Sequence, residues 1–452
     1  MKRRDFLNTI AAIFLIISVQ SCKKYLDAKP DSTLQTIENL NDLRRLLDNF
    51  LLINCSYPGL GDVLADDYYF TDQDLFNSDM AQRNFHTWVR EDDTEPLWRN
   101  PYEVIMTANI VLDELPGVEY QTTEQQERND IMGSALFLRA YYFYGLAQLF
   151  ANPYNNNNNK DSDLGIPLRL NSDINTKVDR ASVKETYERI IADFKQAAPL
   201  LSNSPSFKSR PGKGATYGAL ARTYLTMGEY DSALHYSNKY LSIHDSLANY
   251  NLLSASTTPL QDRFQKEVIF VMRSATISVL GGNRPKVDSV LFRSYNDSDL
   301  RKTIHFRMSV GRPIYRGDFD GSVISSVFSF NGIYTNEIYL VRAECYARKN
   351  QMSEALSDLN TLLVSRYVSG QFNPFTAIDA NDALAKVLLE RKKELMRRGL
   401  RWTDIRRLNN IPPVNSIKPV RNIFTQSFTL PEKPYLLLLP VGAIQLGGLQ
   451  QN

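Results

Sequence analysis

The sequence predicts a mainly α-helical protein built from repeated helix hairpins, with irregular loop-rich insertions and a few short strands. Two observations favour this fold class. A spacing of tyrosines and small residues occurs twice at identical intervals, and several long stretches carry apolar residues at helical periodicity. A third observation shows that the helical pattern does not cover the whole chain, because between residues 250 and 334 it changes to short alternating segments separated by turn residues.

The repeated spacing marks two of the hairpins. In each copy an alanine stands four residues after one tyrosine and three before the next, which gives Tyr217, Ala221 and Tyr224 in the first copy and Tyr339, Ala343 and Tyr346 in the second. The small alanine would let two helices approach closely, while the second tyrosine fills the adjoining groove. Gly228 and Asn350 then occupy the turns that end these helices. The pattern resembles the tetratricopeptide repeat.

Three hairpin segments are expected, at about 97–150, 182–245 and 335–407. The first ends in the polar tract 155–163, which we predict to be an exposed loop. In the second, Ser182 is expected to cap a helix and Glu185 to complete a capping box. The last long helix should run over about 381–398 and stop at Gly399.

The remaining segments look less regular. The insertion at about 250–334 is predicted to contain short strands at VIFVMRS and ISVL. The tail from Ile411 to Asn452 is predicted to be coil, apart from the apolar stretch YLLLLPV, and to pack back on the helices.

Residues 1–21 are predicted to be a cleavable signal peptide. Basic residues precede the apolar run Ile10–Val19, whose length is about half of the roughly 20 residues that a transmembrane helix needs. Val19-Gln20-Ser21-Cys22 resembles the bacterial lipobox, so we expect Cys22 to be lipidated and 22–452 to form one anchored domain. The alternative is an ordinary secretory signal with an incidental cysteine.

Composition argues against several function classes. The formal net charge of +2 is spread without a basic stripe, which argues against nucleic acid as a partner. The four histidines lack metal-ligand spacing, and we predict neither a metal nor a cofactor. The acidic pairs at Asp66-Asp67 and Glu91-Asp92-Asp93 lack a second catalytic motif, so we predict no enzyme. For the distant Cys55 and Cys345 we favour two buried free thiols over a disulfide.

The densest charged cluster lies near the end of the last long helix. Glu390, Glu394 and Arg398 follow one another at intervals of one helical turn, which is typical of ion pairs along a helix surface. We therefore predict a structural ladder on the surface and no catalytic role. Trp402 is expected to pack beneath the final hairpin.

Aromatic side chains with polar neighbours outside the repeats are the best candidates for ligand binding. The 24 Tyr and 22 Phe exceed what a compact helical core requires in a chain of mean hydropathy −0.33, so some rings should be exposed. Sugar rings stack on such rings while amides and guanidinium groups bind the hydroxyls. The predicted ligand-binding residues are Tyr68, Tyr69, Arg83, Trp88, Asn283, Arg284, Phe292 and Tyr295.

Longer segments from end to end of the mature chain carry a further resemblance. They include SCKKYLDAKP, ANIVLDEL, FLRAYYFYGLAQLF, NEIYLVRAECYARKNQMSEALSDLN, ERKKELMRRGLRWTDIRRL and the closing LLLLPVGAIQLGGLQQN with its final Gln-Asn. In order and spacing these segments resemble the SusD/RagB family of outer-membrane nutrient-uptake lipoproteins of Bacteroidetes.

The resemblance implies a binding protein on the outer face of the outer membrane. Such a protein captures an oligosaccharide and hands it to a SusC-like TonB-dependent transporter, although peptide cargo also occurs in the family. The rival hypothesis is a lipid-anchored repeat scaffold whose concave helix face binds a protein or peptide. A glycan binder should expose its rings in the non-repeat loops, whereas a scaffold should place its ligand groove along the repeat helices.

Overall fold

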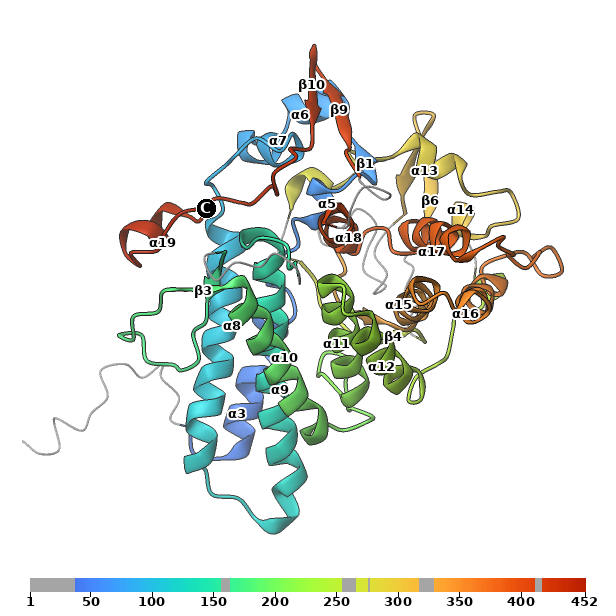
Figure 1. Ribbon diagram of the computed structural model, residues 1–452. Coiled ribbons are helices and arrows are strands. Elements are labelled where there is room, and N and C mark those ends of the chain that lie inside the picture. The colour runs from blue at the N-terminus through green and yellow to red at the C-terminus, as the bar shows by residue number, and fades with distance from the viewer. Residues whose placement is uncertain (1–36, 156–162, 254–265, 275–276, 317–328, 411–416) are drawn as a thin grey trace, which may run out of the picture.

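The computed structural model describes residues 37–155, 163–253, 266–274, 277–316, 329–410 and 417–452. Paired helices fill most of the molecule, and short helices and strands gather at one end (Figure 1). Cys22 and the predicted signal peptide lie outside the described residues. Among the residues that are described, no helix has the length and apolarity needed to cross a membrane.

Long helices occupy all three predicted hairpin segments, which confirms the mainly helical fold. In chain order they are α8 Glu95–Glu114, α9 Gln125–Phe150, α10 Val183–Leu200, α11 Lys213–Met227, α12 Tyr230–Leu241, α15 Thr335–Arg348, α16 Met352–Val364, α17 Ala380–Glu394 and α18 Leu400–Asn409. Shorter helices precede them, namely α3 Leu40–Leu47, α4 Phe50–Ile53, α5 Gly61–Leu64, α6 Asp72–Phe76 and α7 Met80–His86.

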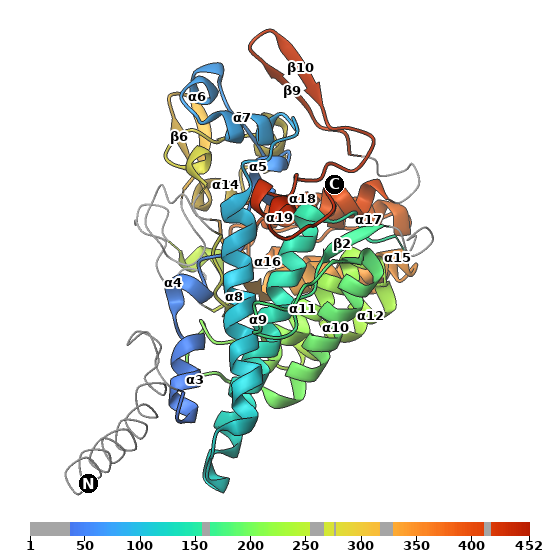
Figure 2. The same ribbon diagram turned by 90° about the vertical axis from the view of Figure 1, so that its left-hand side faces the viewer.

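Helix α9 lies at the centre of the N-terminal helices. Every residue from Gly133 to Phe150 is buried, because α3, α8 and α10 pack around it (Figure 2). A helix that is apolar on all sides is typical of such a position. Its tyrosines keep their hydroxyls bonded, as in the 2.7 Å bond from Tyr142 Oη to the carbonyl of Ile53.

The two repeated segments form the expected hairpins, α11 with α12 and α15 with α16. Gly228 (φ +76°) and Asn350 (φ +60°) adopt left-handed backbone at the predicted turns. Ala343 is buried at a helix contact, as its small size predicts. Tyr224 stacks on Tyr236 of α12, with ring centroids 5.7 Å apart and planes 5° from parallel.

One of the two predicted helix boundaries is confirmed and the other is wrong. The Ser182 hydroxyl accepts a hydrogen bond from Glu185 N (3.1 Å), and the Glu185 carboxylate accepts one from Ser182 N (2.8 Å), which completes the capping box. The last long helix, however, ends at Glu394 and not at Gly399. Gly399 has φ +66° and instead begins α18, since its left-handed backbone starts a new helix direction.

The insertion contains half of the ten strands in the described part of the chain. They are β4 Val268–Phe270, β5 Lys286–Val287, β6 Phe306–Ser309, β7 Arg312–Tyr315 and β8 Ile333–Tyr334, accompanied by the short helices α13 Ser289–Arg293 and α14 Arg301–Ile304. Strand β4 confirms the strand predicted at VIFVMRS. The strand predicted at ISVL is wrong, because Ser278–Leu280 forms a 3-10 turn whose Val279 and Leu280 are both buried. Two further strands, β2 Leu164–Pro167 and β3 Arg180–Ser182, pair beside α10.

The C-terminal tail has more secondary structure than predicted. It forms a hairpin of β9 Val420–Ile423 and β10 Gln426–Thr429, followed by the short helix α19 Val441–Gln445. The turn has no Asn-Gly or Gly pair to reveal it, and Phe424 takes the left-handed conformation (φ +54°) there. The apolar stretch packs back as expected, with Leu437 N bonded to the carbonyl of Leu149 at 3.0 Å.

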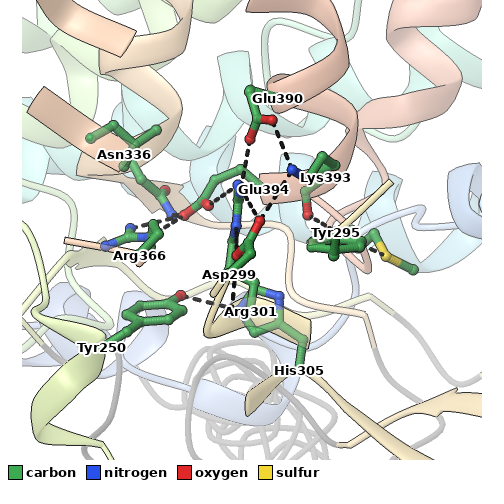
Figure 3. A network of polar contacts seen from close by, with 12 residues as sticks. Tyr250, Tyr295, Asp299, Arg301, His305, Asn336, Arg366, Glu390, Lys393 and Glu394 are labelled. Atoms are coloured by element: carbon green, nitrogen blue, oxygen red, sulfur yellow. Dashed lines mark hydrogen bonds and ion pairs between the residues drawn. The ribbon is translucent and has the colours of Figure 1, made fainter. Parts of the chain in front are cut away.

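The predicted ion-pair ladder on the helix surface is wrong, because its acidic residues belong to a buried network (Figure 3). Glu390 is 2 % exposed and Glu394 is fully buried. Both accept hydrogen bonds from Arg301 of α14, from Nη2 to Glu390 Oε2 at 2.6 Å and from Nη1 to Glu394 Oε2 at 3.0 Å. Arg301 also forms a bidentate pair with Asp299 at 2.9 and 2.7 Å. The cluster is therefore structural, as predicted, but lies inside the molecule.

A second arginine extends the network toward β4. Arg366, just after α16, donates to Glu394 at 2.8 Å and to Glu267 at 2.7 Å. Burial alone would raise the pKa of Glu394, but Arg366 and Arg301 hold that pKa well below its ordinary value. The network thus fixes the irregular insertion to the repeat helices, and with it the strands that carry the predicted ligand-binding residues.

Candidate functional site

A four-stranded sheet joins the two chain regions in which ligand-binding residues were predicted. Its order is β1-β5-β7-β6, where β1 is Tyr68–Tyr69. Tyr69 is paired with Lys286, Lys286 with Ile314, and Ile314 with Arg307. In Figure 1 the blue β1 accordingly lies beside the yellow segment that carries α13 and β6. Segments more than 200 residues apart in the chain therefore meet at this end of the molecule.

The pleat divides the residues of this sheet between two faces, because successive side chains of a strand point to opposite sides. One face is packed into a core that includes Tyr68, Val287, Phe306 and Tyr315. The opposite face, which we call the outer sheet face, carries the cross-strand row Tyr69, Lys286, Ile314 and Arg307. Apart from the buried Ile314, these side chains are half-exposed.

Polar groups hold the edges of the outer sheet face in place. Arg307 Nη2 donates to Asn283 Oδ1 at 2.8 Å, so the predicted Asn283 joins the row. The Lys286 ammonium pairs with Asp74 at 2.5 Å. Arg284 Nη1 donates to the carbonyl of Ser278 at 3.2 Å, on the turn that precedes β5.

Helix α7 is attached to that same turn. Gln82 Nε2 donates to Ser278 Oγ at 2.7 Å, and Gln82 Oε1 accepts from Val279 N at 2.6 Å. The predicted Arg83 follows on this helix and is half-exposed. Tyr69, Arg83, Asn283 and Arg284 are thus carried by structural elements that contact one another.

Three predicted ligand rings are buried, and the prediction that they are exposed is wrong. Tyr68 is 3 % exposed, Trp88 4 % and Tyr295 1 %. Trp88 Nε1 donates to the carbonyl of Leu64 at 3.0 Å, and the Arg421 guanidinium lies 4.0 Å above its ring. Tyr295 Oη donates to the carbonyl of Lys393 at 2.7 Å. Backbone carbonyls satisfy the polar atoms of Trp88 and Tyr295, and all three rings pack in the core.

Phe292 is half-exposed but lies on the other side of the sheet. Its ring meets Phe306 edge-on at 5.6 Å, and Phe306 belongs to the packed inner face. The Lys302 ammonium lies 5.8 Å from the same ring. Phe292 is therefore not part of the outer sheet face.

In the acidic pair Asp66-Asp67 next to β1, Asp66 is half-buried and Asp67 is buried. Asp66 pairs with Arg401 at 2.6 Å and Lys392 at 2.9 Å; burial opposes ionisation, yet these cations keep its pKa well below the ordinary value. Burial raises the pKa of Asp67 to about 7, and the charge of Asp66 adds to this effect. Across the described part of the chain, no cluster of three or more His, Cys, Asp or Glu could hold a metal ion.

Two further sequence predictions concern buried side chains. Trp402 is 2 % exposed, donates from Nε1 to the carbonyl of Gln148 at 3.2 Å, and meets Tyr435 of the tail edge-on. It is therefore buried, and these contacts are with α9 and the C-terminal tail. Cys345 carries a buried free thiol, whereas Cys55 is only half-buried.

The chain matches two protein-family models in succession. Residues 24–225 match a model described as "Starch-binding associating with outer membrane", and residues 335–431 match a model described as "SusD family". A curated relative, SusD-like protein P2 of Formosa agariphila, is 23% identical over 408 residues, which are 76% of this chain and 76% of that protein.

Solved structures share the fold. A SusD superfamily protein from Bacteroides thetaiotaomicron aligns with a TM-score of 0.72 at 21% identity and covers 92% of this chain and 99% of its own. A SusD-like carbohydrate binding protein from Bacteroides vulgatus aligns with a TM-score of 0.67 at 21% identity, over 91% of this chain and 96% of its own. Because the two family matches together span about two thirds of the sequence, the chain belongs to the SusD/RagB-like family.

Proposed function

We propose that the chain is a cell-surface glycan-binding lipoprotein that captures an oligosaccharide and delivers it to a partner SusC-like TonB-dependent transporter. The observation that carries the proposal is the outer sheet face. There the half-exposed Tyr69 ring and Arg307 guanidinium stand in one cross-strand row with the buried Ile314, and the exposed Asn283 amide is bonded to Arg307, so that three separate chain segments contribute. The family description as starch-binding and associated with the outer membrane supports the same function.

The chemistry of the outer sheet face suits a sugar. Tyr69 offers a flat ring on which the C–H face of a pyranose can stack, and a ring side chain loses little conformational entropy when it is immobilised. Arg307 and Lys286 can donate to hydroxyl oxygens, and Asn283 can both donate and accept. We infer binding without catalysis, because Asp66 and Asp74 beside this sheet already pair with lysine or arginine, and Asp67 is buried and does not reach the half-exposed face.

An array of oligosaccharides and peptides, probed with the soluble chain that starts at residue 23, tests this function. We expect oligosaccharide spots to retain the protein, and chromatography after long incubation should recover those sugars intact. Retention on peptide spots alone would favour the rival scaffold hypothesis. Shorter sugar products that disappear in the Asp66→Asn variant would contradict the proposed absence of catalysis.

The proposal places the protein on the outer face of the outer membrane through lipid on Cys22. The lipobox-like Val19-Gln20-Ser21-Cys22 supports this anchor, and the first family match begins just after it, at residue 24. Several acyl chains would be needed, since a single chain binds a membrane only marginally. Cells fed labelled palmitate should label the parent chain but not Cys22→Ala; equal labelling of both would show that Cys22 is not the anchor.

A further inference from the structure

A groove of about 630 Å³ lies away from the outer sheet face. One wall is the N-terminal half of α8, a second is the segment 167–178 between β2 and β3, and a third is the C-terminal α19 and the residues after it. Its volume falls within the roughly 300–1,000 Å³ that is usual for small-ligand sites. No element of the outer sheet face contributes to it.

Two neighbouring aromatic rings line the groove. Trp98 and Tyr102 stand one helical turn apart on α8, with ring centroids 4.9 Å apart. The Trp98 ring is braced edge-on against Phe150 at 5.0 Å, and Tyr102 Oη donates to the carbonyl of Pro167 at 2.8 Å. Trp98 is half-exposed, whereas the other two tryptophans of the chain are buried. A rigidly held, accessible tryptophan is the side chain best suited to stack on a sugar ring.

Polar side chains border these rings. Arg99 and Glu103 each follow one ring along α8, are exposed, and make no side-chain hydrogen bond or ion pair within the described residues. The lining also includes Arg169, Lys177 and Glu95, so cations and carboxylates nearly balance. Such a lining offers donors and acceptors for hydroxyl groups and gives no strong preference to an anion.

The third wall is firmly held. Gly442, Ala443 and Gly447 carry little or no side chain, and Leu446 and Leu449 add apolar surface to the same wall. The final residues fix this wall, because Gln451 exchanges two hydrogen bonds with the backbone of Leu439 (2.7 and 3.0 Å). The Gln-Asn ending noted in the sequence thus has a structural role in shaping the groove.

We propose that this groove is a second carbohydrate-binding site, which holds an uncharged oligosaccharide against Trp98 and Tyr102. It goes beyond the proposed function because it adds a site that is independent of the outer sheet face. Two sites on one chain would hold a glycan at two points, and avidity would raise its retention without any new contact at either site.

Quenching of tryptophan fluorescence by acrylamide tests the second site. Only Trp98 should be open to the quencher, since Trp88 and Trp402 are 4 % and 2 % exposed. Linear gluco-, xylo-, manno- and galacto-oligosaccharides are the probes, used with the soluble chain from residue 23. At least one should protect Trp98 and bind with two equivalents per chain in calorimetry. In Trp98→Ala only the equivalent bound at the outer sheet face should remain. Arg99→Ala should weaken sugar binding in the groove about tenfold or more.

Arg99→Ala also guards against misfolding, because this exposed side chain makes no contact on which the fold depends. Tyr69→Ala is the matched control, since it should remove the other equivalent and leave Trp98 protected. The inference would be overturned if the parent chain bound only one equivalent of sugar, if Tyr69→Ala removed that equivalent, and if no sugar changed the quenching of Trp98. The proposed function would remain intact in that case. If no sugar binds at all, both fail. Protection of Trp98 by the detergent-solubilised transporter but by no sugar would make the groove a protein contact and overturn the inference.

Discussion

Replacing Arg301 by methionine should lower the free energy of unfolding by about 3–5 kcal/mol, the usual effect of removing one partner from a buried ion pair. Arg301 is completely buried and is the common partner of Asp299, Glu390 and Glu394. Without it, three carboxylates would share one dry site with only Lys393 and Arg366 to compensate them. Urea unfolding followed by circular dichroism measures the change.

The same variant should respond to pH in a defined direction. In the parent chain the pKa of Glu394 is held low, so its stabilising effect is fully present at neutral pH and is lost progressively as the pH falls below the ordinary glutamate pKa toward the lowered one. In Arg301→Met the carboxylates would bind protons more readily, and the deficit relative to the parent should shrink in mildly acidic buffer. The neighbouring Lys302→Met is the control, because its partner Asp297 is fully exposed and little change is expected. Equal effects of the two substitutions would contradict the role given to the network.

Local signals in the sequence were sufficient for the repeat helices. The capping box at Ser182 and the left-handed turn at Gly228 depend on neighbours a few residues away, so spacing alone reveals them. The glutamates of α17 show the limit of this approach. Glutamates one helical turn apart have the same spacing on a helix surface and in a protein interior. Here the two glutamates can be buried because Arg301, which lies 93 residues before Glu394, pairs with them. No local pattern carries that information.

The candidate site, too, could be predicted from local sequence signals only in part. The sequence pointed to two chain regions that the structure brings together in one sheet, but it treated Tyr68 and Tyr69 alike. In a strand adjacent side chains face opposite sides, so only one of them could stay accessible, and the pairing with β5 decides which. Trp98 was assigned to a helix and not considered as a ligand contact. Its polar neighbours Arg99 and Glu103 were the available signal, but the wall that turns them into a groove comes from α19, more than 300 residues away.

The second large effect is expected on ligand binding at the outer sheet face. Tyr69→Ala should weaken oligosaccharide affinity at that face by about 1–3 kcal/mol, the range for removing a well-placed aromatic contact. The ring is half-exposed and its removal leaves the packed face of Tyr68 and Val287 untouched, so folding should survive. Phe292→Ala is the matched control, because it removes a half-exposed ring from the opposite side of the same sheet.

Isothermal titration of these two variants with an oligosaccharide selected on the array tests the central claim most directly. A loss of affinity in Tyr69→Ala, with Phe292→Ala binding like the parent, is the result we predict. Unchanged affinity in Tyr69→Ala, together with loss of binding in Tyr217→Ala on the repeat helix α11, would contradict it and place the ligand along the repeats.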